Sequence, residues 1–558
     1  MLSLGIGYQQ THDSSACIAR DGEILFAVAE ERLSRRKHDG RFPVHAIKAC
    51  LDHARVQPAD LDFICFGWPT PGVEFRHTLK TFVNGRFPFS YSHFREVTSQ
   101  YVRMKLQRGG MNQFTERFGP TKARIRFVEH HLAHAISAYA LSGFSDATVV
   151  VVDGRGAWEA TSIWHGQQGR LDHVETIQWP NSLGVFYAEF THYLGFQKNS
   201  DEWKVMGLAP YGSPGIDLRE FIVPDDSPYW INSRRLLGRS GDDASGIESA
   251  FGPRRTPESE IDERCKDLAF AVQDACEVAM MQVIRMAIEK TGCRNVCLAG
   301  GVALNSKANG KILASGMVDK IFVQPAAADD GVALGAALSA HLETDKSLPV
   351  RTMRHAYLGP EYSHREIERI LETYKLRYSR LDDPAKTAAE LLADGKIIGW
   401  FQGRAEFGPR ALGNRSILAD PRDPEMKDKV NNAVKFREAW RPFAPSVLSE
   451  RAPEYVEKPH NSPFMILTFQ VREEKRQVIP AVTHRDGSGR FQTVEQDVNP
   501  LYWRLLKAFE ARTGVPVIMN TSFNLRGEAM VCSPTDAIRT FYSSGMEALV
   551  LGEYMIVK

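Results

Sequence analysis

Long apolar runs, paired cysteines and an excess of one charge are all missing from this 558-residue chain. No stretch approaches 18 consecutive apolar residues, so we expect no membrane span. The first residues, MLSLGIG, carry no basic group and do not read as a signal peptide, so we expect a cytoplasmic protein. The eight cysteines form no C-x-x-C pair, which argues against a disulfide framework and against a cysteine-ligated zinc site.

The charges are balanced, with 69 Lys plus Arg against 68 Asp plus Glu. This balance argues against a generally basic nucleic-acid binder, and we expect no nucleic-acid partner. Hydrophobic residues make up 43% of the chain, which is enough to build large packed cores. The length suggests about three or four core units.

Two segments that lie far apart repeat one order of elements. The first forty residues read as a strand, a polar loop with His12 and Asp13, and two strands joined by the turn Asp21-Gly22. The second copy begins with the β-branched run 148–152, ends in Asp153-Gly154 and continues into strands at 160–164 and 170–175. The repetition predicts a duplicated α/β nucleotide-binding lobe, the pattern of the actin and sugar-kinase ATPase superfamily.

The rest of the chain indicates helices and a domain boundary. Good helix formers follow residue 129 up to Gly143, and apolar residues at three- and four-residue spacing predict a long helix from about 258 to 292. Strands are expected at 295–298 and 321–323. The charged, proline-containing segment 342–354 shows no periodicity, so we expect two domains, residues 1–345 and 354–558.

Histidines and aspartates form a candidate metal site. His130 and His134 are four residues apart, so on a helix both imidazoles project from one face. Asp153 closes one strand, and the pair Asp329-Asp330 closes another. Two histidines with one or two carboxylates suit Fe(II), Mn(II) or Zn(II), and without cysteine ligands a catalytic role is favoured over a structural one. The alternative to a metal site is that the histidines pack in the core and that the aspartates cap helices or form turns.

Other residues of the first domain could contact a nucleotide or an acceptor. Gly300-Gly301 after a strand would let the backbone approach a phosphate, and Asn305 could hydrogen-bond nearby. A tight strand-to-helix turn would give the same pattern. His12 could act as general base for an acceptor hydroxyl, although a lone loop histidine is more often idle.

Cationic and hydrogen-bonding residues converge in the second domain. Lys435-Phe436-Arg437 and Ser522-Phe523-Asn524 are K-x-R and S-x-N pairs, and each would place two polar side chains on one side of an extended segment. Such a set suits an acyl phosphate or acyl adenylate. Four more arginines lie near them among glycines and prolines: Arg410, Arg415, Arg441 and Arg490. They could form a shaped anion-binding loop or a solvated charged surface.

Over nearly its whole length the chain resembles the NodU/CmcH family of O-carbamoyltransferases, which act in the biosynthesis of antibiotics and other natural products and of nodulation factors. The resemblance rests on motifs that are specific in combination: residues 11–16 (THDSSA), 129–135 (EHHLAHA), 152–154 (VDG), 204–212 (KVMGLAPYG), 300–305 (GGVALN), 408–416 (GPRALGNRS) and 520–524 (NTSFN).

The resemblance implies two catalytic modules. The first is similar to the tRNA threonylcarbamoyl-transferring enzymes of the ATPase fold, and the second to the YrdC/Sua family, whose K-x-R and S-x-N signature it shares. In that pattern the second module makes carbamoyl adenylate from carbamoyl phosphate and ATP, with Mg²⁺ accompanying the ATP. The first holds a metal, with iron as first choice and Mn or Zn as alternatives, at His130, His134, Asp153 and Asp329. There an acceptor hydroxyl takes the carbamoyl group.

Three other functions compete with this interpretation. A small-molecule kinase of the same superfamily would release ADP in place of AMP, and a tRNA threonylcarbamoylation enzyme would bind tRNA. A non-catalytic nucleotide-driven scaffold would not need so many site-like arginines and histidines. We expect the acceptor to be a hydroxylated small molecule, but the sequence does not identify it. The sequence is also compatible with a homodimer. Acceptor contacts are expected from the segments 69–112 and 223–253.

Overall fold

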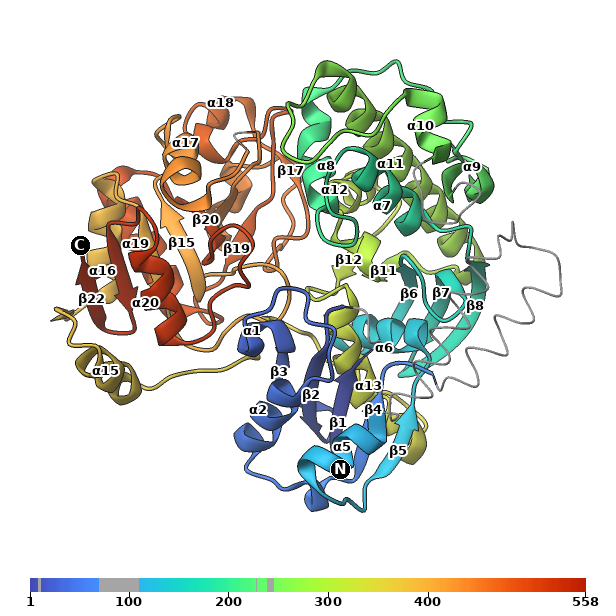
Figure 1. The fold of residues 1–558 in the computed structure, drawn as a ribbon, viewed down its shortest axis with the longest axis horizontal. Helices are drawn as coiled ribbons and strands as arrows, with labels where there is room; N and C mark the ends of the chain where they lie inside the picture. The colour runs from blue at the N-terminus through green and yellow to red at the C-terminus, as the bar shows by residue number, and fades with distance from the viewer. Residues whose placement is uncertain (9–11, 70–109, 227, 238–244, 439) are drawn as a thin grey trace. The chain divides into compact units, whose positions relative to one another are not determined.

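The computed structural model describes residues 1–8, 12–69, 110–226, 228–237, 245–438 and 440–558 (Figure 1). The chain divides into two compact units. The first contains Met1–Glu30 and Gly40–Met353, and the second contains Glu31–Asp39 and Arg354–Lys558. The short segment Glu31–Asp39 thus belongs to the second unit, whereas the predicted limits assigned it to the first domain. Most of the segment 69–112, where we expected acceptor contacts, lies outside the described residues.

Two five-stranded sheets with one topology form the framework of the first unit. Their strand orders are β3-β2-β1-β4-β5 and β8-β7-β6-β11-β12. In each sheet the first three strands of the order are antiparallel and the remaining two continue parallel to the third. The duplicated lobe predicted from the sequence is therefore confirmed. The strands are β1 (Leu2–Gly7), β2 (Ser15–Arg20), β3 (Glu23–Ala29), β4 (Phe63–Phe66), β5 (Arg124–Phe127), β6 (Asp146–Val152), β7 (Glu159–Gln167), β8 (Arg170–Gln178), β11 (Asn295–Ala299) and β12 (Lys320–Val323).

Two helices, α6 (His130–Ser142) and α13 (Val332–Leu338), join these sheets into one core. Helix α6 packs on the second sheet, α13 packs on the first, and the two helices pack on each other (Figure 1). They approach closely because α13 carries a glycine at the crossing: a Cβ on Gly335 would lie 1.8 Å from the carbonyl oxygen of Ala133. The small side chains of α6 (HHLAHAISAYALS) suit this burial. The sheet ends and helix starts therefore meet at one place, where the candidate metal ligands lie.

The remaining helices of the first unit surround this framework. Helix α11 (Glu263–Thr291) begins five residues after the predicted start because Asp262 caps it, with a side-chain oxygen that accepts from Cys265 N. It packs on α7, α8 and α12. The other elements are α2 (Val44–Ala54), α5 (Gly110–Phe118), α7 (Leu183–Tyr193), α8 (Glu202–Leu208), β9 (Ile222–Val223), β10 (Trp230–Ile231), α9 (Ser233–Leu237), α10 (Ser245–Phe251), α12 (Ser306–Ala314) and α14 (His341–Thr344).

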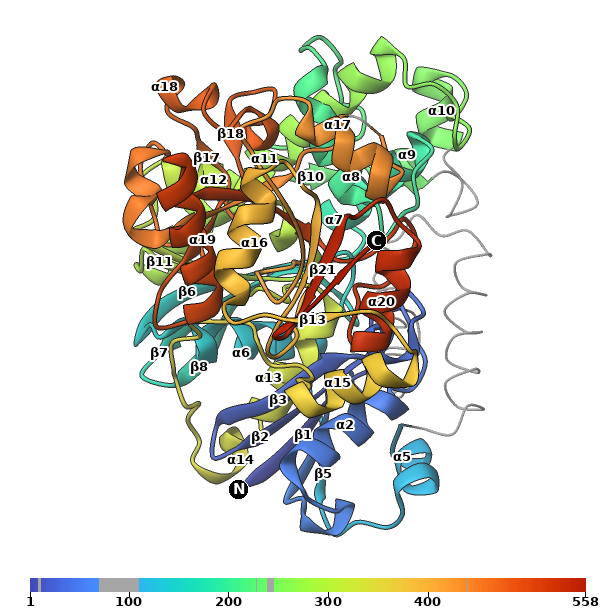
Figure 2. The ribbon, with the colours of Figure 1, turned by 90° about the vertical axis from the view of Figure 1, so that its left-hand side faces the viewer.

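A mixed eight-stranded sheet forms the second unit, in the order β13-β22-β21-β14-β15-β20-β16-β19. Two of its strands, β13 and β21, are labelled in Figure 2. Helices α16 and α19 pack on each other, α19 also packs on β16 and β20, and α20 packs on β14 and β21. The elements are β13 (Ser379–Arg380), β14 (Ile398–Phe401), β15 (Arg415–Ala419), β16 (Ala444–Leu448), β19 (Gln492–Val494), β20 (Val517–Ser522), β21 (Ala548–Leu551), β22 (Tyr554–Val557), α15 (His364–Thr373), α16 (Pro384–Ala393), α17 (Met426–Val430), α18 (Glu473–Arg476), α19 (Pro500–Thr513) and α20 (Pro534–Tyr542), with β17 (Phe469–Gln470) and β18 (Ser488–Gly489) as a separate pair.

Two arginines hold the segment Glu31–Asp39, which includes most of α1 (Glu30–Ser34), within the second unit. Arg35 donates to the carbonyl oxygens of Met530 at 2.6 Å and Ala529 at 2.7 Å, and its Nε lies 3.2 Å from a carboxylate oxygen of Asp536. Arg32 donates to the carbonyl oxygen of Gly408 at 2.9 Å. The segment is therefore an integral part of the second unit's hydrogen bonding. Among the described residues, no helix is both long and apolar enough to cross a membrane.

Candidate functional site

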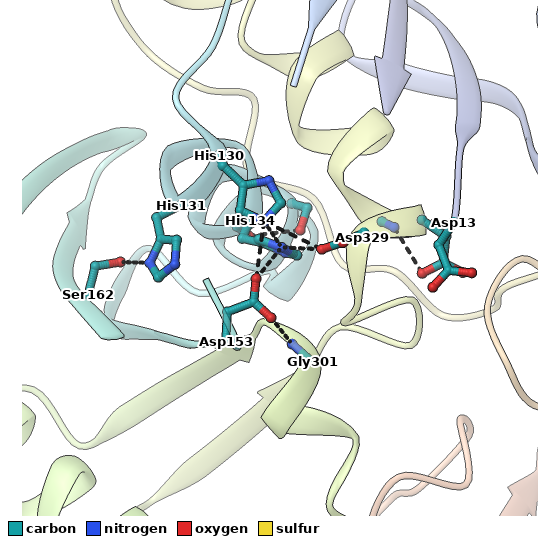
Figure 3. Close-up of polar contacts among 12 residues, drawn as sticks. Asp13, His130, His131, His134, Asp153, Ser162, Gly301 and Asp329 are labelled. Atoms are coloured by element: carbon teal, nitrogen blue, oxygen red, sulfur yellow. Dashed lines mark hydrogen bonds and ion pairs between the residues drawn. The ribbon is translucent and has the colours of Figure 1, made fainter. Parts of the chain in front are cut away.

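Four side chains from three parts of the first unit form a buried cluster (Figure 3). His130 and His134 lie on the first turns of α6, so their four-residue spacing turns both rings to one face, as predicted. Asp153 follows the last residue of β6, and Asp329 begins the short turn before α13. Asp153 and Asp329 thus follow two strands of one sheet, β6 and β12, and both carboxylates reach the start of the same helix.

The donor atoms of the cluster lie at the spacing of metal ligands. His130 Nε2 lies 3.1 Å from both His134 Nε2 and Asp153 Oδ2, and 3.4 Å from Asp329 Oδ1. His134 Nε2 lies 3.7 Å from each of the same two carboxylate oxygens. Ligands about 2.1 Å from a tetrahedral metal ion would lie about 3.4 Å from one another. Two imidazole nitrogens and two carboxylate oxygens thus fit a divalent transition metal.

The electrostatics of the cluster also favour a cation. Burial lowers the pKa of His130, but hydrogen bonds and charges of Asp153 and Asp329 outweigh it and raise that pKa to about 10. Burial would raise the pKa of both carboxyl groups, yet their contacts with the imidazoles keep both pKa values below the usual range. The site therefore keeps two carboxylates ionised in a buried position, and a metal ion could replace the proton that His130 otherwise carries.

Asp329, and not its neighbour Asp330, faces the two imidazoles. The carbonyl oxygen of Asp330 accepts from Ser15 Oγ at 2.7 Å, and its carboxylate accepts from Gly331 N at 3.1 Å. His12 reaches the cluster from the other side, with Nδ1 lying 3.4 Å from Asp329 Oδ2 and 3.2 Å from Asp13 Oδ2. Burial lowers the pKa of His12, but its acidic neighbours Asp13 and Asp329 raise it to about 9.

The glycine pair after β11 supports the cluster. Gly301 N donates to Asp153 Oδ1 at 3.0 Å (Figure 3), which orients that carboxylate. Gly300 has φ +89°, and a Cβ there would lie 2.3 Å from the carbonyl oxygen of Val152, so only glycine fits. Asn305, expected to contact a nucleotide, instead caps α12 by accepting from Ala308 N at 3.1 Å. The structure thus gives each of these three residues a structural role, and their contacts with a phosphate stay a prediction.

Two further polar residues lie beside the cluster. His131 is fully buried, and its Nδ1 lies 2.9 Å from Ser162 Oγ (Figure 3), so it does not join the ligands on the other side of the helix. Glu159 on β7 was not predicted. Burial raises the pKa of its carboxyl to about 7, and a Cβ on Gly156 would touch both Glu159 and His131. A single glutamate inside a strand carries no local signal that could have revealed it.

In the second unit, Lys435 joins the two halves of the K-x-R and S-x-N pattern. Its Nζ donates to the carbonyl oxygen of Ser522, and to the carbonyl and side-chain oxygens of Asn524 at 2.9 Å each. Ser522 ends β20, but Lys435 ends a π-turn, Asn431–Lys435, and the next residue is left-handed. The prediction of an extended K-x-R segment is therefore wrong, although Lys435, Ser522 and Asn524 do come together.

Charge interactions connect this lysine with a group of four arginines, Arg410, Arg437, Arg441 and Arg490. Burial lowers the pKa of Lys435, and the charges of Arg437 and Arg441 lower it further. Burial likewise lowers the pKa of Arg490, with added repulsion from Arg410 and Arg437. Burial alone lowers the pKa of Arg410 to about 10. These cations thus lower one another's pKa in a region of little negative charge, and perturbed groups of this kind gather at functional sites.

The arginines of this group differ in how they are held. Arg437 donates through Nε to Asn431 Oδ1 at 2.8 Å and lies over the Phe443 ring, whereas Arg410 and Arg490 have no hydrogen bond or ion pair within the described residues. Arg441 lies 3.3 Å from a carboxylate oxygen of Glu438. Arg410 and Arg490 are therefore the guanidinium groups that remain available to an anion.

Arg415 has another role. It is fully buried, and its two terminal nitrogens donate to four main-chain carbonyl oxygens, those of Pro360, Gln402, Gly403 and Asn414, at 2.5–3.0 Å. We assign it a structural role in place of the predicted ligand contact. Glu406, which the sequence did not single out, holds the same loop: its Oε1 accepts from the main-chain nitrogens of Leu412, Asn414 and Arg415.

Comparisons with known proteins identify the family of the chain. A family profile described as "Carbamoyltransferase N-terminus" matches residues 3–338, and one described as "Carbamoyltransferase C-terminus" matches residues 389–558. The chain belongs to the carbamoyltransferase family. The predicted resemblance is thereby confirmed, and the protein is an enzyme that transfers a carbamoyl group.

Individual relatives match over most of the chain. "Nodulation protein NolNO" of Sinorhizobium fredii is 42% identical over 98% of this chain and 79% of its own length. "Uncharacterized protein sll1178" of Synechocystis is 40% identical over 98% of this chain and 95% of its own. Among solved structures, T. kodakarensis HypF is 14% identical with a TM-score of 0.32 over 62% of this chain and 48% of its own, a similarity too low to carry an argument.

Proposed function

We propose that this carbamoyltransferase is ATP-dependent and works in two half-reactions. The second unit makes carbamoyl adenylate from carbamoyl phosphate and ATP, and the first unit transfers the carbamoyl group to a hydroxyl of a small molecule. The observation that carries the proposal is chemical: one unit holds a cation cluster suited to phosphates, and the other holds a 2-His-2-Asp cluster suited to a divalent metal.

The first half-reaction uses the cation cluster. Water cleaves carbamoyl phosphate to carbamate and inorganic phosphate, a carbamate oxygen then attacks the α-phosphorus of ATP, and pyrophosphate leaves. Lys435 would hold the reacting phosphates, because Ser522 and Asn524 fix its Nζ. Arg410 and Arg490 would bind phosphate oxygens through guanidinium nitrogens that no described residue occupies. Their fixed positive charge stabilises the charge that develops on the leaving groups.

The second half-reaction uses the cluster at the start of α6. When a divalent cation is bound to His130, His134, Asp153 and Asp329, it supplies a Lewis acid that polarises a carbonyl or phosphate oxygen. His12 would take the proton of the acceptor hydroxyl on Nε2, because Nδ1 faces Asp13 and Asp329. A nearby metal charge would lower the pKa of His12 from about 9 toward the range in which the ring can accept a proton.

The acceptor is proposed from the relatives. Several of them are named as nodulation proteins, among them NolNO, NolO and "Nodulation protein U". We infer a sugar or another hydroxylated natural product as the acceptor class. The proposed cofactors are ATP with Mg²⁺ and a divalent metal, with Fe(II) as first choice and Mn(II) or Zn(II) as alternatives.

Separate assays of the two half-reactions test the proposal. Carbamoyl-phosphate-dependent exchange of labelled pyrophosphate into ATP measures the first, and carbamoyl transfer from synthetic carbamoyl adenylate to a panel of hydroxylated metabolites measures the second. Lys435→Met should abolish exchange and leave transfer, and His130→Ala should do the reverse. Lys386→Met, at an exposed lysine, is the matched control. Equal loss of both activities in both variants, or ADP as the adenine product, would refute the proposal.

A further inference from the structure

The residue between the two cations of the K-x-R motif has an unusual environment. Phe436 lies between Lys435 and Arg437, yet 53% of its surface is exposed. Its backbone is left-handed, with φ 46° and ψ 50°. A bulky residue with positive φ is a genuine outlier, and such strained positions gather at functional sites.

Neighbouring hydrogen bonds hold Phe436 in this conformation. Phe436 N donates to the carbonyl oxygen of Asn431 at 2.6 Å, which closes the π-turn. The side chain of the same asparagine accepts from Arg437 Nε at 2.8 Å. Asn431 therefore fixes the chain on both sides of Phe436. The reversal at Phe436 allows Lys435 to reach Ser522 and Asn524 while the phenyl ring stays outside.

An exposed ring beside a buried cation cluster has the chemistry to receive a nucleobase. A nucleoside triphosphate carries charged phosphates at one end and a flat aromatic base at the other. Bases stack on exposed aromatic side chains in many single-strand binding proteins, since every base presents a π-face. Several large apolar side chains are exposed in the described part of the second unit. Among them, only Phe436 is adjacent in the sequence to residues of the cation cluster.

We infer that the Phe436 ring is the surface on which the adenine of ATP stacks when its phosphates lie among the cations. This inference rests on the proposed adenylate-forming function and adds a binding residue to it. The ring takes no part in the chemistry. It contributes affinity for the nucleoside end of ATP and none for carbamoyl phosphate.

Kinetics of the pyrophosphate exchange test the inference, because exchange reports on the second unit alone. Phe436→Ala should raise the KM for ATP roughly 10-fold, the loss expected for one stacked base, and leave the KM for carbamoyl phosphate unchanged. Inorganic tripolyphosphate, which has no base, should inhibit the wild type and the variant with equal Ki. Phe436→Trp should restore the KM for ATP, because indole also stacks.

A glycine variant separates the ring from the backbone. Phe436→Gly removes the ring but adopts the left-handed conformation without strain, so it should match Phe436→Ala if the ring is what matters. An unchanged KM for ATP in Phe436→Ala would overturn the inference. Equal weakening of ATP and tripolyphosphate would also overturn it, since the ring would then only shape the phosphate site. A wild-type protein without exchange activity would refute the proposed function itself, and the stacking with it.

Discussion

Replacing Arg410 by methionine should make the second unit more stable while weakening its hold on anions. The guanidinium of Arg410 has no hydrogen bond or ion pair within the described residues. Burial lowers its pKa from the ordinary arginine value to about 10. Because the folded pKa lies below the unfolded value, the charged form costs stability at every pH below about 10. Methionine keeps an unbranched apolar side chain and removes the charge.

The size of the effect follows from the pKa. The lowering of the Arg410 pKa to about 10 corresponds to about 3 kcal/mol at most, because a tenfold change in an equilibrium constant is about 1.4 kcal/mol. Removing buried charges in favour of apolar groups has a stabilising range of about 1–4 kcal/mol, so we expect a gain of about 1–3 kcal/mol in the free energy of unfolding. Pyrophosphate at 100 times its Kd should stabilise the wild type by about 2.7 kcal/mol. The variant should lose most of that increment.

Hydrogen exchange in the whole chain measures this change locally. Peptides that cover β14 and β20 report the opening free energy of the second unit at pH 7.5, with and without pyrophosphate. Arg415→Met is a matched control in the same loop. Because four carbonyl oxygens would lose their donor, it should lower the opening free energy by about 3–5 kcal/mol. A loss of stability in Arg410→Met, or a full response to pyrophosphate, would refute the reasoning.

Three further predictions concern the metal cluster and the segment Glu31–Asp39. In chelator-treated protein, the charged form of His130 should stabilise the fold, because its pKa is raised to about 10. This stabilisation should be complete below pH 6.5 and lost as the pH rises through 10. Urea titrations across this range should show the decline in the free energy of unfolding, and His130→Ala should flatten it. Gly300→Ala should lower the affinity for Zn²⁺ or Mn²⁺ about 10- to 100-fold in equilibrium dialysis, because it displaces the strand end that carries Asp153, and an unchanged affinity would count against this role. Arg35→Met should lower the opening free energy of the second unit by about 3–5 kcal/mol in hydrogen exchange, whereas the exposed Arg36→Met should not.

Local patterns were enough to predict the framework of the first unit. The β-branched run 148–152 lies within β6, and the helix expected after residue 129 is α6, with both histidines on one face. These features depend on neighbours in the sequence, because strand and helix periodicity decide which side chains share a face. The gathering of His130, His134, Asp153 and Asp329 followed from two strands of one sheet, β6 and β12, that lead to the start of α6.

Long-range contacts decided what the sequence could not predict. Arg410 and Arg415 stand in one glycine-rich loop and look alike in the sequence, but only Arg415 meets four carbonyl oxygens. The left-handed turn at Phe436 depends on Asn431, five positions earlier, and an extended K-x-R segment was the wrong prediction. Asn305 was expected at a phosphate and instead caps a helix, a choice that both patterns permit.

The place of Glu31–Asp39 in the second unit also governs how the protein is made. Arg35 and its acceptor Met530 are 495 residues apart. At about 5–20 residues per second, a ribosome needs about 25–100 s to synthesise the interval between them. A basic stretch that leaves the ribosome early must therefore wait, without its final partners, until translation is almost finished. The second unit cannot complete its fold on the nascent chain before then, and this waiting period is when chaperones would have their opportunity.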